Sequence, residues 1–299
     1  MHGPHKTHAV EHSRIPAIDG LRGASILLVV AGHLMAWRFA GQLPLLIVQL
    51  GIFLSHLGVM LFFTISGFVI TRRALTQYRQ GFFSVKFFYF RRAVRILPAF
   101  IVYLLTIAIL SLLGWIDQAP SGLIKAASFS CNLFNDCDWF AGHSWTLAYE
   151  WQFYLAFPAL LLVFRRYMPI ALMLIALIAL VVVALEAVQS DAQSISFIAA
   201  GCVAAFFFEH LNTLFNTTFL QQAKNATSIP FLQFFGKISY SLYLWQQLCT
   251  APPAKYQTES LLLLPVFLLP LAYISYRYVE KTTGDWFKRK RSEPLLKQS

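Results

Sequence analysis

Three ionisable residues lie in the first long apolar stretch of the chain, IDGLRGASILLVVAGHL: Asp19, Arg22 and His33. Ionisable groups inside a membrane span are costly and usually serve function. Arg22 and His33 are eleven residues apart, which places both on one helix face with a rise of about 16 Å between them. An arginine at the mouth of a helix bundle can bind an anion, and a deeper histidine can accept a proton. Taken singly, Arg22 fits a snorkelling cation and His33 an interhelical hydrogen bond, but their shared face favours a functional pair.

A carboxylate of suitable depth occurs later in the chain. Glu150 lies six residues into the apolar block SWTLAYEWQFYLAFP, about 9 Å from the expected outer end of that helix. His33 is expected at a compatible depth, and a carboxylate beside an imidazole orients it and raises its basicity. Helix packing, or an ion pair with an arginine, explains Glu150 equally well from spacing alone.

Further polar groups are candidates for binding a substrate. Arg92 and Arg95 in FFYFRRAVRILP share a helix face and suit phosphate groups, although anchoring to lipid headgroups is the simpler interpretation of the pair. Tyr240, Tyr243 and Trp245 in GKISYSLYLWQQ, with Ser66 in FFTISGF, could line a polar pocket. Bundle packing and interhelical hydrogen bonds are the alternative for these residues.

The elements that must position these residues are membrane helices. Of 299 residues, 58% are hydrophobic and only 12% are charged, against about 25% charged in soluble domains. Spans need about 20 apolar residues, so we predict an all-α, polytopic membrane helix bundle of about eight transmembrane helices. The predicted spans are 18–37, 51–71, 94–114, 144–164, 168–187, 194–210, 230–250 and 260–280. The segment 42–50 is either a short interfacial helix or the start of the second span.

Cations indicate the orientation. Lys and Arg cluster between alternate spans, and the other side holds only Arg38, Lys125 and Lys255. The positive-inside rule therefore predicts a multi-pass protein of the cell membrane with both termini cytoplasmic. It accounts for most of the net charge of +11, so the lipid bilayer is the expected partner and nucleic acid is not. We expect a disordered tail over 1–16, a membrane domain over 17–282 and a basic cytoplasmic tail over 283–299.

The longest outer loop, 115–143, contains Cys131 and Cys137. On an oxidising face the two form a disulfide; two free thiols are the alternative. His2, His5, His8 and His12 lie in the polar N-terminal tail, where nothing indicates a rigid metal cage. No metal site and no bound cofactor are predicted, since the zinc, P-loop and dinucleotide motifs are missing from the sequence.

Six segments in order resemble the membrane-bound acyltransferase family 3. IDGLRG…GHL is similar to its arginine–histidine signature, and GVMLFFTISGFVITRR, FRRAVRILPAF, SWTLAYEWQFYLAFP, GKISYSLYLWQ and YRYVEK resemble later motifs, over residues 16–282. The resemblance implies transfer of an acyl group, often acetyl from acyl-CoA as co-substrate, to hydroxyls of carbohydrates. It implies a glycan or glycolipid acceptor such as a cell-surface glycan.

The resemblance also implies roles. Arg92 and Arg95 would meet the anionic coenzyme on the inner side, and Arg22 would guide it into the bundle. His33 would deprotonate the acceptor hydroxyl or relay the acyl group, and Glu150 would orient His33. The sequence departs from the family at Gln246, commonly a histidine, and at Thr282, commonly a proline. The family also commonly has about ten helices.

Two other functions fit the same residues. A transporter or flippase could use Asp19, Arg22, His33 and Glu150 as a substrate or proton path, although inverted repeats are not evident in the sequence. An inactive relative of the family is the second alternative, and Gln246 favours it.

Overall fold

The computed structural model describes residues 16–134, 137–164, 167, 170, 172–175, 177, 191–214, 225 and 228–296. The predicted N-terminal tail, with its histidines, and most of the predicted span 168–187 lie outside these residues. The described part is helical apart from one isolated bridge between Ile116 and Tyr256. In chain order the main elements are α1 (Pro16–His33), η1 (Leu34–Arg38), α2 (Leu45–Arg79), α3 (Val85–Leu112), α4 (Pro120–Ala127), α5 (Asp138–Gly142), α6 (Ser144–Phe164), α8 (Asp191–Leu214), α10 (Pro230–Cys249), α11 (Leu264–Ser275), η6 (Tyr276–Glu280) and α12 (Lys281–Leu296).

Several predicted spans coincide with helices. α1, continued by η1, covers the first predicted span, α6 the fourth and α10 the seventh. Most of the segment 42–50 is the start of the second span and not a separate interfacial helix, because α2 runs unbroken from Leu45. The third helix begins at Val85, earlier than the predicted start near residue 94. Ser84 caps it by accepting a hydrogen bond from the Phe87 amide, so Arg92 and Arg95 lie inside the helix rather than at its start.

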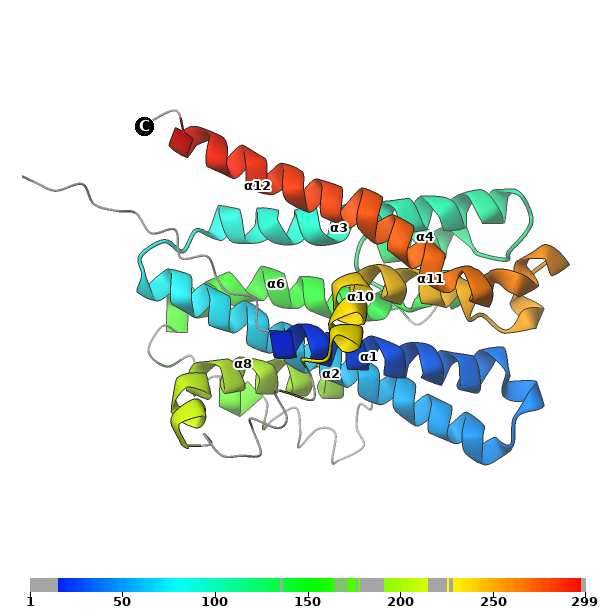
Figure 1. The fold of residues 1–299 in the computed structure, drawn as a ribbon, viewed down its shortest axis with the longest axis horizontal. Helices are drawn as coiled ribbons and strands as arrows, with labels where there is room; N and C mark the ends of the chain where they lie inside the picture. Colours follow the sequence, from blue (N-terminus) through cyan, green and yellow to red (C-terminus); the bar gives the residue numbers. More distant parts are fainter. Residues whose placement is uncertain are drawn as a thin grey trace, which may run out of the picture.

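The C-terminal end differs from the prediction of a simple tail. α12 continues the path of α11 and η6 as far as Leu296. The ring of Phe287 packs on those of Phe87 and Phe90, with centroid distances of 5.4 and 5.3 Å. The first turns of α3 and the basic C-terminal helix therefore support each other, and Figure 1 shows the two running side by side.

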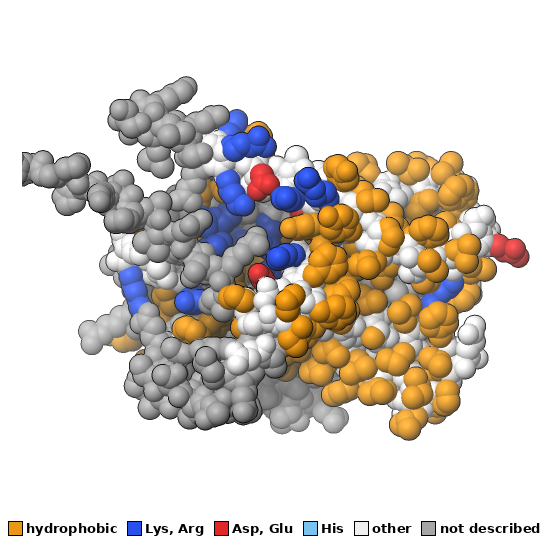
Figure 2. Space-filling view, in the orientation of Figure 1, with side chains coloured by type: hydrophobic (Ala, Val, Ile, Leu, Met, Phe, Trp, Pro, Cys, Tyr) orange, Lys and Arg blue, Asp and Glu red, His pale blue; other side chains and the backbone are white. Residues whose placement is uncertain are grey.

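Four helical stretches in the described residues are long and apolar enough to cross a membrane: Pro16–Arg38, Leu45–Arg79, Val85–Leu112 and Glu259–Lys290. Large apolar side chains face outward on them, including Leu46, Leu105, Ile109 and Val266, as expected where lipid replaces water. Figure 2 shows one face of the molecule, on which hydrophobic side chains cover the right half and most Lys and Arg side chains gather away from that half. A membrane helix bundle fits this surface. The count of eight spans stays a prediction.

Glycines bring three helices into close contact. A Cβ on Gly23 of α1 would lie 1.9 Å from the Leu232 carbonyl oxygen of α10, and one on Gly236 of α10 would lie 1.8 Å from the Asp19 carbonyl oxygen. Gly32 of α1 is similarly tight against Gly51 of α2. Because these positions have no side chain, α1 lies against both α2 and α10 (Figure 1). This packing places the ionisable face of α1 at the centre of the bundle.

Candidate active site

A cavity of about 60 Å³ lies where four helices meet. Arg22 comes from α1, Glu150 and Thr146 from α6, and Tyr240 and Tyr243 from α10. Val59, Phe62 and Phe63 of α2, with Leu147 and Ser239, complete its wall. Four predicted site residues from three separate segments are thus brought together around one partly apolar space. An arginine and a carboxylate in such a space can hold and orient a polar ligand.

Glu150 has a partner other than the predicted one. The Tyr154 hydroxyl, one turn later on α6, donates to Oε2 of Glu150 at 3.0 Å, and Ser66 of α2 hydrogen-bonds Tyr154. The charge of Glu150 also acts on Arg22. Among the described residues, the hydrogen-bond partner of Glu150 is Tyr154 and not His33. This contact fits the helix-packing alternative for Glu150, and its role in orienting His33 stays a prediction.

His33 is oriented by its own helix. Its Nδ1 lies 2.9 Å from the carbonyl oxygen of Val29. A carbonyl can only accept, so Nδ1 carries the proton and the lone pair is on Nε2. The ring packs on that of Trp37 at a centroid distance of 4.5 Å. The Val29 carbonyl thus orients the imidazole and leaves Nε2 able to accept a proton. We had predicted that Glu150 orients this ring.

The two arginines of α3 differ in environment. Arg92 is buried, with its guanidinium over the rings of Phe88 and Tyr154 at 5.3 and 5.4 Å. Arg95 is exposed, and its charge acts on Arg22, Arg92 and Glu280. Asp19 also acts on Arg22. Cations from α1 and α3 therefore gather on one side of the cavity, as binding of an anionic donor would require.

The aromatic candidates of α10 divide into two groups. Tyr240 and Tyr243 line the cavity. The Tyr240 hydroxyl donates to the Ile96 carbonyl at 2.9 Å and the Tyr243 hydroxyl to the His143 carbonyl at 3.0 Å. Trp245 does not line the cavity and is buried. Gln246 is also buried, and its amide bonds Gln247 and Thr250, so the residue standing in place of the usual histidine is used in packing.

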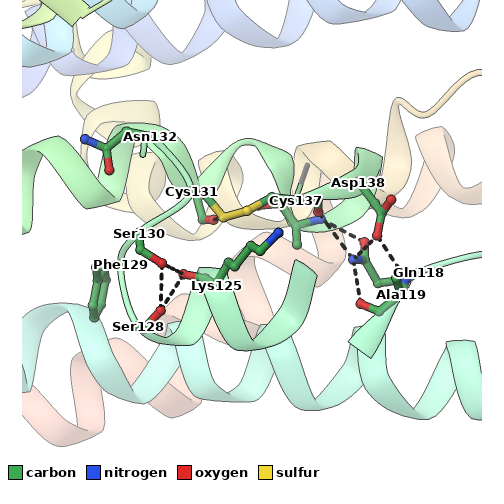
Figure 3. The surroundings of a disulfide bond; sticks show 12 residues. Gln118, Ala119, Lys125, Ser128, Phe129, Ser130, Cys131, Asn132, Cys137 and Asp138 are labelled. Atoms are coloured by element: carbon green, nitrogen blue, oxygen red, sulfur yellow. Dashed lines mark hydrogen bonds between the residues drawn. A yellow bond between two sulfur atoms is a disulfide. The ribbon is translucent and has the colours of Figure 1, made fainter. Parts of the chain in front are cut away.

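The end of the site near His143 rests on a loop that contains a disulfide. Cys131 and Cys137 form a disulfide, which Figure 3 shows beside Gln118 and Asp138. Gln118 Nε2 donates to Asp138 Oδ2 at 3.1 Å and its Oε1 accepts from the Ala141 amide at 3.1 Å. These bonds hold α5 and the start of α6 in place.

Two residues that sequence reasoning missed adjoin the site. Glu280 of η6 accepts a hydrogen bond from Ser241, and its charge is coupled to Arg95 and Arg22. His143, between α5 and α6, is close enough to His33 for their charges to interact. Burial and then nearby His33 lower the pKa of His143 to about 3, so its ring is neutral. His143 directly precedes the motif SWTLAYEWQFYLAFP, and this position was the available signal in the sequence.

Within the described residues, His, Cys, Asp and Glu do not form a group of three that could hold a metal ion.

Comparison with known proteins adds independent findings. A sequence family described as an acyltransferase domain matches residues 15–210. A putative O-acetyltransferase of Staphylococcus aureus is 33% identical over 161 residues, 49% of this chain and 24% of that protein. The peptidoglycan O-acetyltransferase OatA of Listeria monocytogenes is 28% identical over 180 residues, 54% of this chain and 26% of that protein.

A putative peptidoglycan O-acetyltransferase of Bacillus subtilis is 29% identical over 197 residues, 58% of this chain and 28% of that protein. The chain thus spans about a quarter of the length of these relatives. Solved structures give no match. Because the family match covers well over half of the sequence, the chain belongs to the acyltransferase 3 family and carries its acyltransferase domain.

Proposed function

We propose that this domain transfers an acetyl group from acetyl-CoA to a hydroxyl of a cell-surface glycan, within the cell membrane. The observation that carries the proposal is the cavity that joins Arg22 to Glu150, Tyr240 and Tyr243, with His33 on the same helix in the tautomer of a base. The peptidoglycan named for two relatives supports a glycan acceptor.

The positions of the cations suggest how the donor would bind. Arg92 and Arg95 lie on α3 and Arg22 on the cavity wall. Guanidinium groups bind phosphates through paired hydrogen bonds, so the nucleotide end of acetyl-CoA would rest on this side. The rise from Arg22 to His33 is about 16 Å, which is the distance that an extended thioester arm would span along α1.

The transfer step needs one base. Nε2 of His33 takes the proton of the acceptor hydroxyl while that oxygen attacks the thioester carbonyl. The new C–O bond forms, the C–S bond breaks, and the imidazolium returns its proton to the departing thiolate. Relay of the acetyl group through His33 is the alternative sequence of events, with the same balance.

The test is acetyl transfer by the purified full chain in lipid nanodiscs, with radiolabelled acetyl-CoA and, in turn, chito-oligosaccharides, muropeptides and glycolipids. We expect glycan-dependent release of CoA with label in the glycan. His33→Ala should lower the rate by about 100-fold or more, the usual contribution of a general base.

His56→Ala is the matched control, since His56 is an exposed histidine on membrane helix α2, and it should keep wild-type turnover. Folding of each variant is followed by gel filtration and thermal unfolding. Full turnover by folded His33→Ala would refute the role of His33. Failure of the folded wild-type protein to bind acetyl-CoA would refute the proposed function.

A further inference from the structure

Two buried side chains, His143 near His33 and Trp245 of α10, have polar atoms without a partner in the described structure. Both ring nitrogens of His143 and Nε1 of Trp245 make no hydrogen bond within the described structure. His143 is 5% exposed and Trp245 is 7% exposed. Buried polar atoms are almost always bonded, because an unbonded one loses the hydrogen bonds that water gave it. These three atoms belong to two rings that pack on the same tyrosine, and they indicate that a polar partner binds there.

Tyr103 connects the two side chains. Its ring meets that of His143 edge-on at 5.2 Å and that of Trp245 edge-on at 5.6 Å. Its hydroxyl already donates to the Phe140 carbonyl at 2.7 Å. Tyr103 therefore packs on both rings without supplying the hydrogen bonds they lack.

The pair adjoins both parts of the proposed site. His143 interacts electrostatically with His33, and its ring lies 5.4 Å from that of Tyr243. Tyr243 and Thr146 line the cavity, and both donate to the His143 carbonyl. His143 thus lies just beyond the cavity wall, on the side of His33.

The backbone around His143 is fixed. Ser144 donates to the Ala141 carbonyl and to Sγ of Cys131, which belongs to the disulfide. Gln118 bonds the Ala141 amide from the preceding loop. The imidazole is therefore presented on a rigid turn, as a binding residue requires.

The chemistry of the unbonded atoms indicates the kind of ligand. A neutral imidazole offers one donor and one acceptor, and an indole offers one donor. Such a set fits a hydroxyl group, which both gives and accepts, next to a second oxygen. Neighbouring oxygens of this kind are what a sugar ring presents, whereas a phosphate would need a cation here.

We propose that His143 and Trp245 form the acceptor subsite, in which their ring nitrogens bind the sugar hydroxyl that is to be acetylated and hold it beside His33. This inference rests on the proposed function and identifies where the acceptor, as distinct from the donor, is recognised.

The experiment compares steady-state kinetics of the wild-type protein with those of His143→Phe, His143→Gln and Trp245→Phe, using the glycan that the wild-type protein acetylates. His143→Phe keeps the volume and loses both nitrogens, and His143→Gln keeps a donor and an acceptor. His56→Phe and Trp115→Phe are matched controls, since His56 and Trp115 are exposed. Binding of acetyl-CoA is measured separately by calorimetry.

We expect His143→Phe to raise the KM for the glycan tenfold or more, with unchanged binding of acetyl-CoA. His143→Gln should restore part of the loss, and Trp245→Phe should show a smaller rise. An unchanged KM for the glycan in folded His143→Phe, or an equal loss of acetyl-CoA binding, would overturn the subsite while wild-type turnover still supported the transferase. Absence of any transfer by the wild-type protein would overturn both.

Discussion

The hydroxyl of Tyr154 donates to Oε2 of Glu150 at 3.0 Å, across one turn of α6. The guanidinium of Arg92, from α3, lies over the ring of the same tyrosine at 5.4 Å. One side chain thus connects an arginine expected to meet the donor with the carboxylate of the cavity. The hydroxyl of Tyr154 contacts Glu150 and its ring contacts Arg92, so a mutation that removes only the hydroxyl tests the first contact without the second.

Tyr154→Phe should keep the stacking of Arg92 and remove the hydrogen bond to Glu150. A hydrogen bond to a charged group contributes about 1.5–3 kcal/mol, and about 1.4 kcal/mol corresponds to a tenfold change in rate. We therefore expect the unfolding temperature to fall by several degrees. Because Glu150 loses the contact that fixes it in the cavity, kcat/KM for acetyl transfer should also fall by about 10- to 100-fold.

Tyr89→Phe is the matched control for this change. The Tyr89 hydroxyl also joins α3 to α6, by donating to the Leu155 carbonyl at 2.9 Å, but it does not reach Glu150. It should leave kcat/KM near the wild-type value. Equal losses in the two variants would mean that helix docking, and not the Glu150 contact, explains the effect.

Gly236→Ala should separate α10 from α1. Its Cβ would lie 1.8 Å from the backbone oxygen of Asp19, so a helix must move, at a cost of about 1–3 kcal/mol. The unfolding temperature should drop by several degrees and acetyl-CoA binding should weaken, because Arg22 moves with α1. Gly284→Ala, where the added Cβ meets nothing within 4 Å, should be neutral or stabilising. Similar stability of the two variants would contradict the close crossing.

Reduction should destabilise the loop that contains Cys131 and Cys137. The Cys131–Cys137 disulfide closes a short loop, and such bonds stabilise by about 2 kcal/mol or somewhat more. Dithiothreitol should therefore lower the unfolding temperature of the wild-type protein. The double variant Cys131→Ala with Cys137→Ala should unfold at the lower temperature with or without reductant. The buried thiols Cys202 and Cys249 provide the control: their replacement by Ser should leave the response to reductant intact.

The sequence predicted the helices best where apolar runs end abruptly. α6 and α10 match the predicted spans because polar or Pro-containing turns precede Ser144 and Pro230. The start of α3 was missed because its first turns mix aromatic and basic residues, which signal an amphipathic helix rather than a span. The helix cap at Ser84 was the local signal there.

The site was only partly predictable for a similar reason. The shared face of Arg22 and His33 follows from helical period alone. The four-residue spacing of Glu150 and Tyr154 would also have revealed their contact. The position of His143 depends on a disulfide and on Gln118, and that of Glu280 on the docking of η6. Such long-range arrangements cannot be derived from local spacing.

α2 has 35 residues, which corresponds to about 52 Å of helix. The hydrocarbon layer is about 30 Å thick, and even a tilt of 40°, at the upper end of the observed range, would leave more than 10 Å of this helix outside it. The end that carries Arg72, Arg73 and Arg79 then projects beyond the hydrocarbon layer. A charged nucleotide would meet these arginines before it reached the hydrocarbon layer. It would therefore be bound at one place and lose its hydration water at another.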